Sequence, residues 1–368
     1  QEIYRIFGLE PSEFKANFEA FLNSIHPDDR EFVKQSVHSA LYESKPYRIH
    51  YRLIRPNGEE RIIHSQGEAT FDPTGKPVRL AGTAQDVTEY KQTETALVHR
   101  VEMEKLISSI STNFINLGPH EIDRGIHTAL EVIGQFCGVD RSYVFLFSEN
   151  HATVDSTYEW CAIGIEPLAQ RPQGLPVEGV PWFMKKIKNR EPVHVPSVRN
   201  LPPEASAERS EWQTVGIQSL VAVPMIYGGN LIGFLGFESW KSEKSWSDED
   251  IGLLKMVGEI FVHALERKRV EASLHHLAHY DRLTELPNRT LFFDRLSQEL
   301  SRAPWRNRLV AVMYLDLDRF QRINDTLGHE TGDRLIQAVA HRLTQCVRDG
   351  DTVARLGAHS LGGPIRAP

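Results

Sequence analysis

The sequence of 368 residues has few cysteines, no excess of positive charge and no uninterrupted apolar segment of membrane-spanning length. Its three cysteines, Cys137, Cys161 and Cys346, are far apart and form no CxxC pair or Cys/His cluster, a pattern typical of a reduced intracellular protein. The net charge of -7 gives no electrostatic footprint for nucleic acid or for an acidic membrane. These absences predict a cytoplasmic protein that does not bind nucleic acid.

The longest uncharged run covers residues 219–237 and is nearly long enough to cross a membrane. Pro224 and the sequence Gly228-Gly229-Asn230 interrupt it in the middle. Two β-rich arms around a glycine turn are typical of a hairpin. We therefore predict a buried β-hairpin here and no membrane segment in this chain.

Residues 1–95 show helical patterns followed by alternating apolar residues, typical of strands, near 47–53, 61–71 and 78–87. Turn sequences at residues 56–58 and 72–75 separate these strands and predict an antiparallel meander. With the motifs at residues 4–8, 25–30 and 86–89, the segment resembles the C-terminal part of a PAS domain, without the family's first two strands. His26 precedes Pro27 and Asp28, a pattern that favours a helix start over a haem ligand.

Residues 106–265 predict an α/β domain with a helix near 121–136, a strand at 141–147, the hairpin, and a final helix that Ser247 or Asp248 caps. This order resembles a GAF domain. Its scattered histidines favour surface or core roles over metal binding, and its tryptophans favour core packing over a pocket. These residues are His120, His127, His151, His194, Trp160, Trp182 and Trp212.

Helical linkers are expected at residues 96–110 and 266–278. Apolar residues recur at roughly helical spacing in the first linker and at three- and four-residue spacing before the second, which fits a two-helix seam. We expect parallel coiled-coil connectors in a homodimer, and the alternative is a helix packed on its own domain. The residues concerned are Leu97, Val101, Leu106 and Ile110, then Leu254, Val257, Phe261 and Ala264.

The third segment begins near residue 279, and residues 309–315 form a near-continuous apolar run that predicts a buried strand. Asp316 and Asp318 follow at its carboxyl end, where ligands collect in α/β sheets. A carboxylate there can hold Mg²⁺ against a triphosphate. The pattern therefore predicts a nucleotide site.

The motifs at residues 281–289, 316–320, 323–325, 328–333 and 348–351 resemble the diguanylate cyclase (GGDEF-type) family. The resemblance implies that the Asp316 carboxylate and the Leu317 carbonyl hold the metal. It also implies a substrate site of four residues. In this site Asn324 and Asp333 read the guanine, and His329 lies near the phosphates. Arg348 and Asp351 match the family's inhibitory site for cyclic di-GMP. The substrate-site residues are Asn324, Asp333, His329 and Phe320.

The family pattern stops after Gly357, where Ala358 and His359 replace a glycine and the second metal carboxylate. Imidazole is a poor ligand for Mg²⁺, which prefers oxygen. Gln321 also replaces a lysine that is usual in the family. The tail at residues 358–368 has no alternating strand pattern, and we expect an aberrant segment that completes no catalytic site.

The sequence thus predicts an α/β (α+β) multidomain chain with a PAS part at 1–95, a GAF part at 106–265 and an incomplete GGDEF part at 279–357. The expected function is intracellular signalling, in which the sensory parts regulate a diguanylate cyclase output that makes cyclic di-GMP from two GTP and is inactive in this chain. One alternative is a non-catalytic receptor for cyclic di-GMP or GTP. Another is a frameshifted fragment of an active enzyme.

Overall fold

The computed structural model describes residues 2–9, 17–167, 174–306, 309–348, 350–357 and 360–366. The chain forms two compact units, residues 1–106 and residues 107–368. No helix within those described ranges is both long and apolar enough to cross a membrane.

The first unit contains an antiparallel sheet in the order β1-β2-β3, as the meander prediction required. Its His26 Nδ1 accepts the Asp28 backbone N–H at 3.4 Å, and Pro27 follows at the first helical position, so the predicted helix start is confirmed. The elements are α1 (Glu2–Phe7), α2 (Phe18–Asn23), η1 (Pro27–Asp29), α3 (Arg30–Tyr42), β1 (Tyr47–Ile54), β2 (Glu60–Phe71) and β3 (Pro77–Asp86).

Alternation along β1 places Ile49, Tyr51 and Leu53 on one face of this sheet, where they are buried. Ile25 and Ile63 pack into the same cluster as Ile6 and Phe7 of α1. The first unit therefore has a core of its own on one face of its sheet.

The second unit begins with an α/β part whose antiparallel sheet has the order β6-β5-β4-β9-β8-β7. The predicted strand at 141–147 and the predicted hairpin are confirmed as β4 and as β8 with β9. The elements of this part are α4 (Thr88–Asn116), which enters it at Ile107, α5 (Ile122–Cys137), β4 (Arg141–Phe147), β5 (Thr153–Cys161), β6 (Leu175–Pro176), α6 (Pro181–Lys188), β7 (Val193–Val195), α7 (Ser206–Val215), β8 (Ser219–Tyr227), β9 (Asn230–Ser239) and α8 (Asp248–His279).

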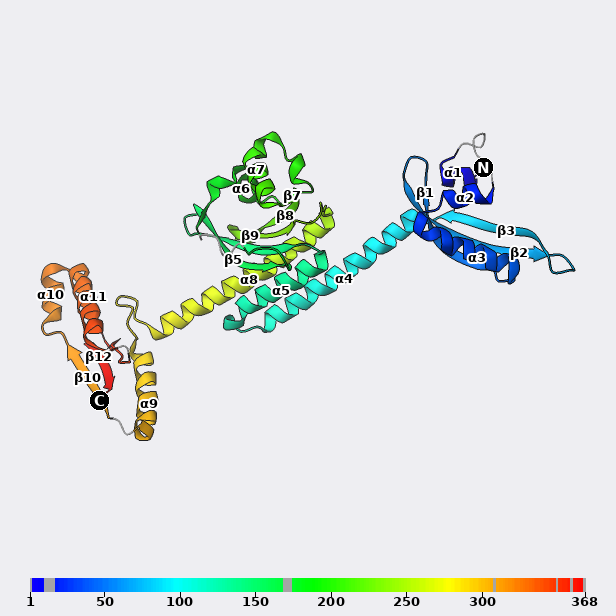
Figure 1. Ribbon diagram of the computed structural model, residues 1–368. Helices are drawn as coiled ribbons and strands as arrows, with labels where there is room; N and C mark the ends of the chain where they lie inside the picture. The colour runs from blue at the N-terminus through cyan, green and yellow to red at the C-terminus, as the bar shows by residue number, and fades with distance from the viewer. Residues whose placement is uncertain are drawn as a thin grey trace. The chain divides into compact units, whose positions relative to one another are not determined.

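Helices cover both faces of this sheet (Figure 1). Helices α5 and α8 lie on one face, and α6 and α7 lie on the other. Helix α8 starts at a capping box in which Ser247 Oγ accepts the Asp250 N–H and the Asp250 carboxylate accepts the Ser247 N–H. The predicted cap of the final helix is therefore confirmed.

The coiled-coil prediction is wrong for the second of its two stripes. Leu254, Val257, Phe261 and Ala264 are buried. They lie on α8 where this helix packs along β8, and Phe261 also contacts Phe114 of α4, with ring centroids 5.5 Å apart. The stripe has the spacing of a helix seam because a helix that covers a sheet needs the same one-sided apolar face.

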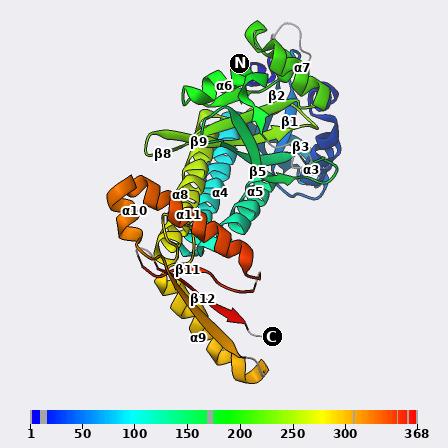
Figure 2. The same ribbon diagram turned by 90° about the vertical axis from the view of Figure 1, so that its left-hand side faces the viewer.

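The last part of the second unit contains a sheet in the order β10-β12-β11, with antiparallel pairing. Strand β10 leads into α10 and α11, which pack against each other (Figure 2). The elements are α9 (Arg289–Arg306), β10 (Val310–Asp316), α10 (Phe320–Leu327), α11 (His329–Cys346), β11 (Ala354–Arg355) and β12 (Ser360–Arg366).

Two predictions for this part are wrong. The tail has no alternating pattern, yet its residues 360–366 form β12 between β10 and β11, because a strand can be held by backbone pairing without an amphipathic sequence. The apolar strand β10 is not buried: Val312, Met313 and Tyr314 are each more than half exposed. Among the described strands β10 pairs only with β12, so it lies at a sheet edge.

Candidate functional site

The carboxyl end of β10 carries the first predicted site residues. Asp316 is the last residue of the strand, and its partner across the sheet is Ser360 of β12. Arg319 then adopts a left-handed conformation with φ of 55°. The turn closes when the Phe320 N–H donates to the Leu317 carbonyl at 3.3 Å. The metal-ligand candidates Asp316 and Leu317 therefore lie in one tight turn, directly before α10.

Helices α10 and α11 meet at Asn324 and Gly332. A Cβ atom at Gly332 would lie 1.8 Å from Asn324 Oδ1 and 3.0 Å from Phe320 Cζ, so glycine is what lets the two helices approach. Asn324 Oδ1 is buried and has no hydrogen-bond partner among the described residues. Phe320 is buried at the same contact, which gives it a packing role.

The other two candidates lie on the first turns of α11. Gly328, with φ of 84°, separates the two helices, and α11 begins at His329. His329 and Asp333 are four residues apart in this helix, so their side chains share one face, and both are exposed. Asp333 directly follows Gly332. The structure thus brings Asn324, His329 and Asp333 to the junction of the two helices.

Arg348 and Asp351 form a turn after α11. The Asp351 N–H donates to the Arg348 carbonyl at 2.9 Å, and the Asp351 carboxylate accepts the Arg348 N–H at 3.2 Å. Arg348 itself is exposed. The two candidates for the cyclic di-GMP site are therefore neighbours. His359, the residue at the expected position of the second metal carboxylate, lies outside the described residues, as does Ala358.

Asp281 and Arg355 hold the start of this part together, a role the sequence analysis missed. The Asp281 carboxylate accepts the Thr284 N–H at 2.9 Å and Arg355 Nη1 at 2.9 Å. The Arg355 N–H also donates to the Pro287 carbonyl at 2.9 Å. Burial raises the pKa of Asp281, but the hydrogen bonds from Arg355 and Thr284 outweigh it, so this pKa lies below its usual value. An acidic residue and an arginine so far apart in sequence gave no signal of pairing.

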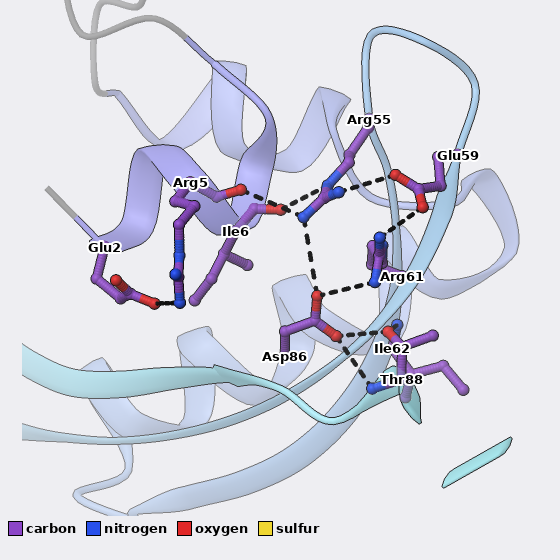
Figure 3. Close-up of polar contacts among 9 residues, drawn as sticks. All are labelled: Glu2, Arg5, Ile6, Arg55, Glu59, Arg61, Ile62, Asp86 and Thr88. Atoms are coloured by element: carbon purple, nitrogen blue, oxygen red, sulfur yellow. Dashed lines mark hydrogen bonds and ion pairs between the residues drawn. The ribbon is translucent and has the colours of Figure 1, made fainter. Parts of the chain in front are cut away.

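Asp86 is the centre of a polar network in the first unit (Figure 3). Its carboxylate accepts the Thr88 N–H at 3.0 Å and lies 3.6 Å from Arg61 and 3.8 Å from Arg55. Arg55 also donates to the Ile6 carbonyl at 3.0 Å. The motif at residues 86–89 therefore links the end of β3 to the start of α4 and to α1.

The structure describes contacts of several histidines and tryptophans of the GAF-like part. Within the described ranges no group of three or more His, Cys, Asp or Glu side chains is placed to hold a metal ion. His194 Nε2 accepts the Trp246 N–H at 3.2 Å, a structural role. Trp212 is buried, as core packing required, but it also lines a cavity.

Sequence models of three domain families match the chain in order. They are the PAS fold over residues 1–84, the GAF domain over residues 121–265, and the "Diguanylate cyclase, GGDEF domain" over residues 278–362. The chain therefore carries a PAS fold, a GAF domain and a GGDEF domain.

Two relatives are diguanylate cyclases by name. The chain is 24% identical over 366 residues to the probable diguanylate cyclase DgcE of Escherichia coli (strain K12), an alignment that covers 98% of the chain and 28% of DgcE. It is 42% identical over 123 residues to the diguanylate cyclase TpbB of Pseudomonas aeruginosa (strain UCBPP-PA14), covering 31% of the chain and 28% of TpbB. The chain thus spans less than a third of the length of either relative.

A solved structure of the GGDEF domain of TpbB from Pseudomonas aeruginosa (PAO1) is 42% identical over the aligned region. The alignment covers 24% of this chain and 51% of that one, with a TM-score of 0.23.

Proposed function

We propose that this chain is a signalling protein in which the PAS and GAF domains regulate a GGDEF output domain that binds GTP at the junction of β10, α10 and α11. The observation that carries the proposal is Asn324 Oδ1, which is buried at the helix contact without a partner among the described residues. A buried acceptor without a donor is costly, and a donor group from a ligand would satisfy it. A guanine amine or imino N–H is such a donor.

Asp333 supports the same assignment. Its carboxylate is exposed on α11, one residue beyond the Gly332 contact with Asn324. An ionised carboxylate only accepts hydrogen bonds, and the Watson–Crick edge of guanine presents two neighbouring N–H donors. His329, on the same helix face as Asp333, would contact a triphosphate that extends away from the base toward the start of α11. These three residues would bind and orient the nucleotide.

The residues at the end of β10 fit a magnesium ion in kind. Asp316 offers a carboxylate and Leu317 a carbonyl, and Mg²⁺ is usually bound by one or two carboxylates together with substrate phosphates and water. When bound there, the ion would neutralise charge that develops on the phosphates. The two protein ligands are adjacent in one turn, so they would fix the position of the phosphates relative to the base.

The reaction expected of an output domain with all its metal ligands joins two GTP molecules and requires two copies of the site. The 3′-hydroxyl of each GTP attacks the α-phosphate of the other, and each attack releases pyrophosphate and a proton, giving cyclic di-GMP. A single site holds one nucleotide, so two protomers must face each other. We infer a homodimer that forms through the exposed stripe of α8, namely Val270 (51% exposed), Leu274 (60%) and Leu277 (47%). This stripe has four- and three-residue spacing, as in a coiled-coil seam.

Catalysis in this chain is expected to be absent or very weak. At the position of the second metal carboxylate the sequence has His359, and a neutral imidazole does not replace an anionic oxygen ligand for Mg²⁺. Loss of a metal ligand that stabilises the transition state costs several kcal/mol of barrier lowering. The retained residues would then bind GTP without cyclising it.

Incubation of the purified chain with GTP and Mg²⁺, followed by chromatography for bound GTP and for cyclic di-GMP, tests this proposal. We expect GTP binding that weakens in Asp316→Asn, with no cyclic di-GMP. Product that disappears in Asp316→Asn would overturn the expectation of inactivity and leave the site assignment intact. A folded dimer that does not bind GTP would overturn the assignment itself.

A second candidate function is a receptor for cyclic di-GMP, favoured by the turn that holds Asp351 next to the exposed Arg348. The planar guanidinium suits phosphate oxygens and the guanine edge. We expect labelled cyclic di-GMP to bind the chain, and Arg348→Ala to weaken binding about tenfold, or about 1.4 kcal/mol. Arg342→Ala on the exposed surface of α11 is the matched control. Binding that is equal in both variants would exclude this site.

A further inference from the structure

Helix α8 packs on the GAF domain for only part of its length. The buried stripe that covers β8 ends at Ala264, whereas residues 269–278 are all exposed. Between these two parts lie Arg267 and Lys268, two consecutive cations that are partly buried. They therefore mark the point at which α8 leaves the domain.

Arg267 holds the end of α4, which is at Asn116. Its Nη2 donates to the carbonyls of Phe114 at 2.8 Å and Leu117 at 2.9 Å, and its Nη1 donates to the Ile115 carbonyl at 3.4 Å. The last carbonyls of a helix have no partner within it and lie at the negative end of its dipole, so a guanidinium suits them. The end of α4 and the exit of α8 therefore cannot separate without breaking these hydrogen bonds.

Lys268 holds α5, which lies beside α8 (Figure 1). Its Nζ donates to the two carboxylate oxygens of Asp123 at 2.7 and 2.6 Å, and Asp123 is in the first turn of α5. Asp123 Oδ1 also accepts the hydroxyl of Tyr158, a residue of β5, at 2.6 Å. The hydrogen bonds from Lys268 and Tyr158 lower the pKa of Asp123, so the carboxylate is charged at neutral pH. One carboxylate thus joins a strand of the sheet to α8.

Beyond Ala264, polar contacts replace apolar packing between α8 and the domain. Phe261, which contacts Phe114 with ring centroids 5.5 Å apart, precedes Arg267 by six residues. The side chains of Lys268 and Asp123 are 37% and 48% exposed. Exposed ion pairs contribute little to stability, so this contact can open while the domain stays folded.

We propose that Arg267 and Lys268 form a two-point latch that fixes where α8 leaves the GAF domain, and that Asp123 makes this latch sensitive to the position of β5. When Tyr158 moves away, Asp123 loses a hydrogen bond that orients its carboxylate toward Lys268, and residues 265–268 loosen. The exposed stripe of α8 begins two residues later, at Val270. The state of the latch would therefore set how this stripe is presented, a consequence that rests on the proposed homodimer, whereas the latch itself does not.

Hydrogen exchange in the full chain tests the latch at the amides of residues 265–268, which precede the exposed stripe. Arg267→Met removes the donors and keeps an unbranched side chain. It should raise the exchange rate of these amides and of those at residues 115–117 about tenfold, since both helix ends then open locally. Arg269→Met is the matched control, because Arg269 is exposed and lies 3.8 Å from Glu266 of the same helix, and it should change neither group.

The amides of Val257 and Phe261, in the buried part of α8, report whether the domain stays folded and should be unchanged. If Arg267→Met proves unstable, Lys268→Met at its partly exposed position provides the same test and should also raise exchange at residues 265–268. Exchange that stays at the native rate in a folded Arg267→Met or Lys268→Met chain would overturn the latch.

Tyr158→Phe tests the relay through Asp123, because it removes only the hydroxyl that donates to this carboxylate. It should raise exchange at residues 265–268 about threefold in the native chain. It should have no effect there in Lys268→Met, which has no cation left to respond, whereas Lys268→Arg should retain the response. No effect in the native chain, or an equal effect in Lys268→Met, would overturn the relay. No nucleotide is added, so failure here leaves the proposed GTP site untouched, and failure of the GTP experiment leaves the latch untouched.

Discussion

Gly332 sets the position of Asn324 because nothing larger fits between α10 and α11. The Cβ atom of Gly332→Ala would overlap the Asn324 carboxamide, and the side chain of Asn324 would have to rotate away. We expect GTP binding to weaken about tenfold, or about 1.4 kcal/mol, as measured by calorimetry. The usual helix gain of alanine over glycine, about 0.5–1 kcal/mol, should be offset by this clash.

The matched control is Gly252→Ala, at an exposed position of α8 where a Cβ atom meets nothing within 4 Å. This variant should be more stable by about 0.5–1 kcal/mol and should bind GTP normally. If Gly332→Ala bound GTP as tightly as the native chain, Asn324 would not be a contact of the base.

The lowered pKa of Asp281 predicts how the stabilisation that its carboxylate provides depends on pH. Because its folded pKa lies below its unfolded value, the stabilisation is complete above the unfolded pKa of about 4 and disappears as the pH falls through the folded pKa. Asp281→Asn should therefore lower the protection of the Leu283 and Thr284 amides at pH 7, with a difference from the native chain that shrinks below about pH 4. Hydrogen exchange, corrected for the intrinsic exchange rate at each pH, measures the protection of these two amides.

Asp294→Asn is a suitable control, since Asp294 is exposed on α9 and its carboxylate accepts from Gln298 only four residues away. It should leave the Leu283 and Thr284 amides unchanged at every pH. A difference between Asp281→Asn and the native chain that grew on acidification would contradict the assigned direction of the pKa shift.

At the scale of elements, local sequence patterns predicted the type and the bounds of helices and strands well. They predicted less well which of these elements are buried. Strand β4 and the β8–β9 hairpin were expected from β-rich runs and a glycine turn, and Ser247 from its capping position. These signals are local: alternation, turn chemistry and cap hydrogen bonds depend on neighbouring residues. The same reasoning identified β10 as a strand but not as an exposed one, because burial depends on which distant elements pack against it.

In the candidate site, too, features set by neighbouring residues could be predicted, and contacts between distant residues could not. The motif spacing placed the candidate residues Asp316, Asn324, His329 and Asp333 in the chain, and their role in a nucleotide site stays a prediction. The pairing of Asp281 with Arg355 could not be predicted, because it joins positions 74 residues apart. The cavity that Trp212 lines was also missed, since aromatic residues signal a core equally well, and only packing leaves the space.

At the scale of the whole molecule, we proposed a homodimer in which two nucleotide sites, one on each protomer, face each other. The stripe of α8 that was expected to form the seam is used within the protomer, since Leu254 and Phe261 are buried. The exposed residues Val270, Leu274 and Leu277 follow along the same helix. Association through them would bury apolar side chains that otherwise contact water, which contributes about 25 cal/mol per Å² of buried area.

Leu274→Asp tests this seam, because an aspartate at the centre of a two-helix contact would bury a charge without a partner. Sedimentation equilibrium should give a dimer for the native chain and a monomer for Leu274→Asp. Ile163→Asp makes the same kind of change at a fully exposed residue outside the stripe and should leave the dimer intact. GTP binding per protomer should be equal in all three proteins, since the site residues lie within one chain. A native chain that is monomeric at micromolar concentration, or a Leu274→Asp protein that stays dimeric, would exclude α8 as the seam, and the two nucleotide sites would then have to meet through another surface.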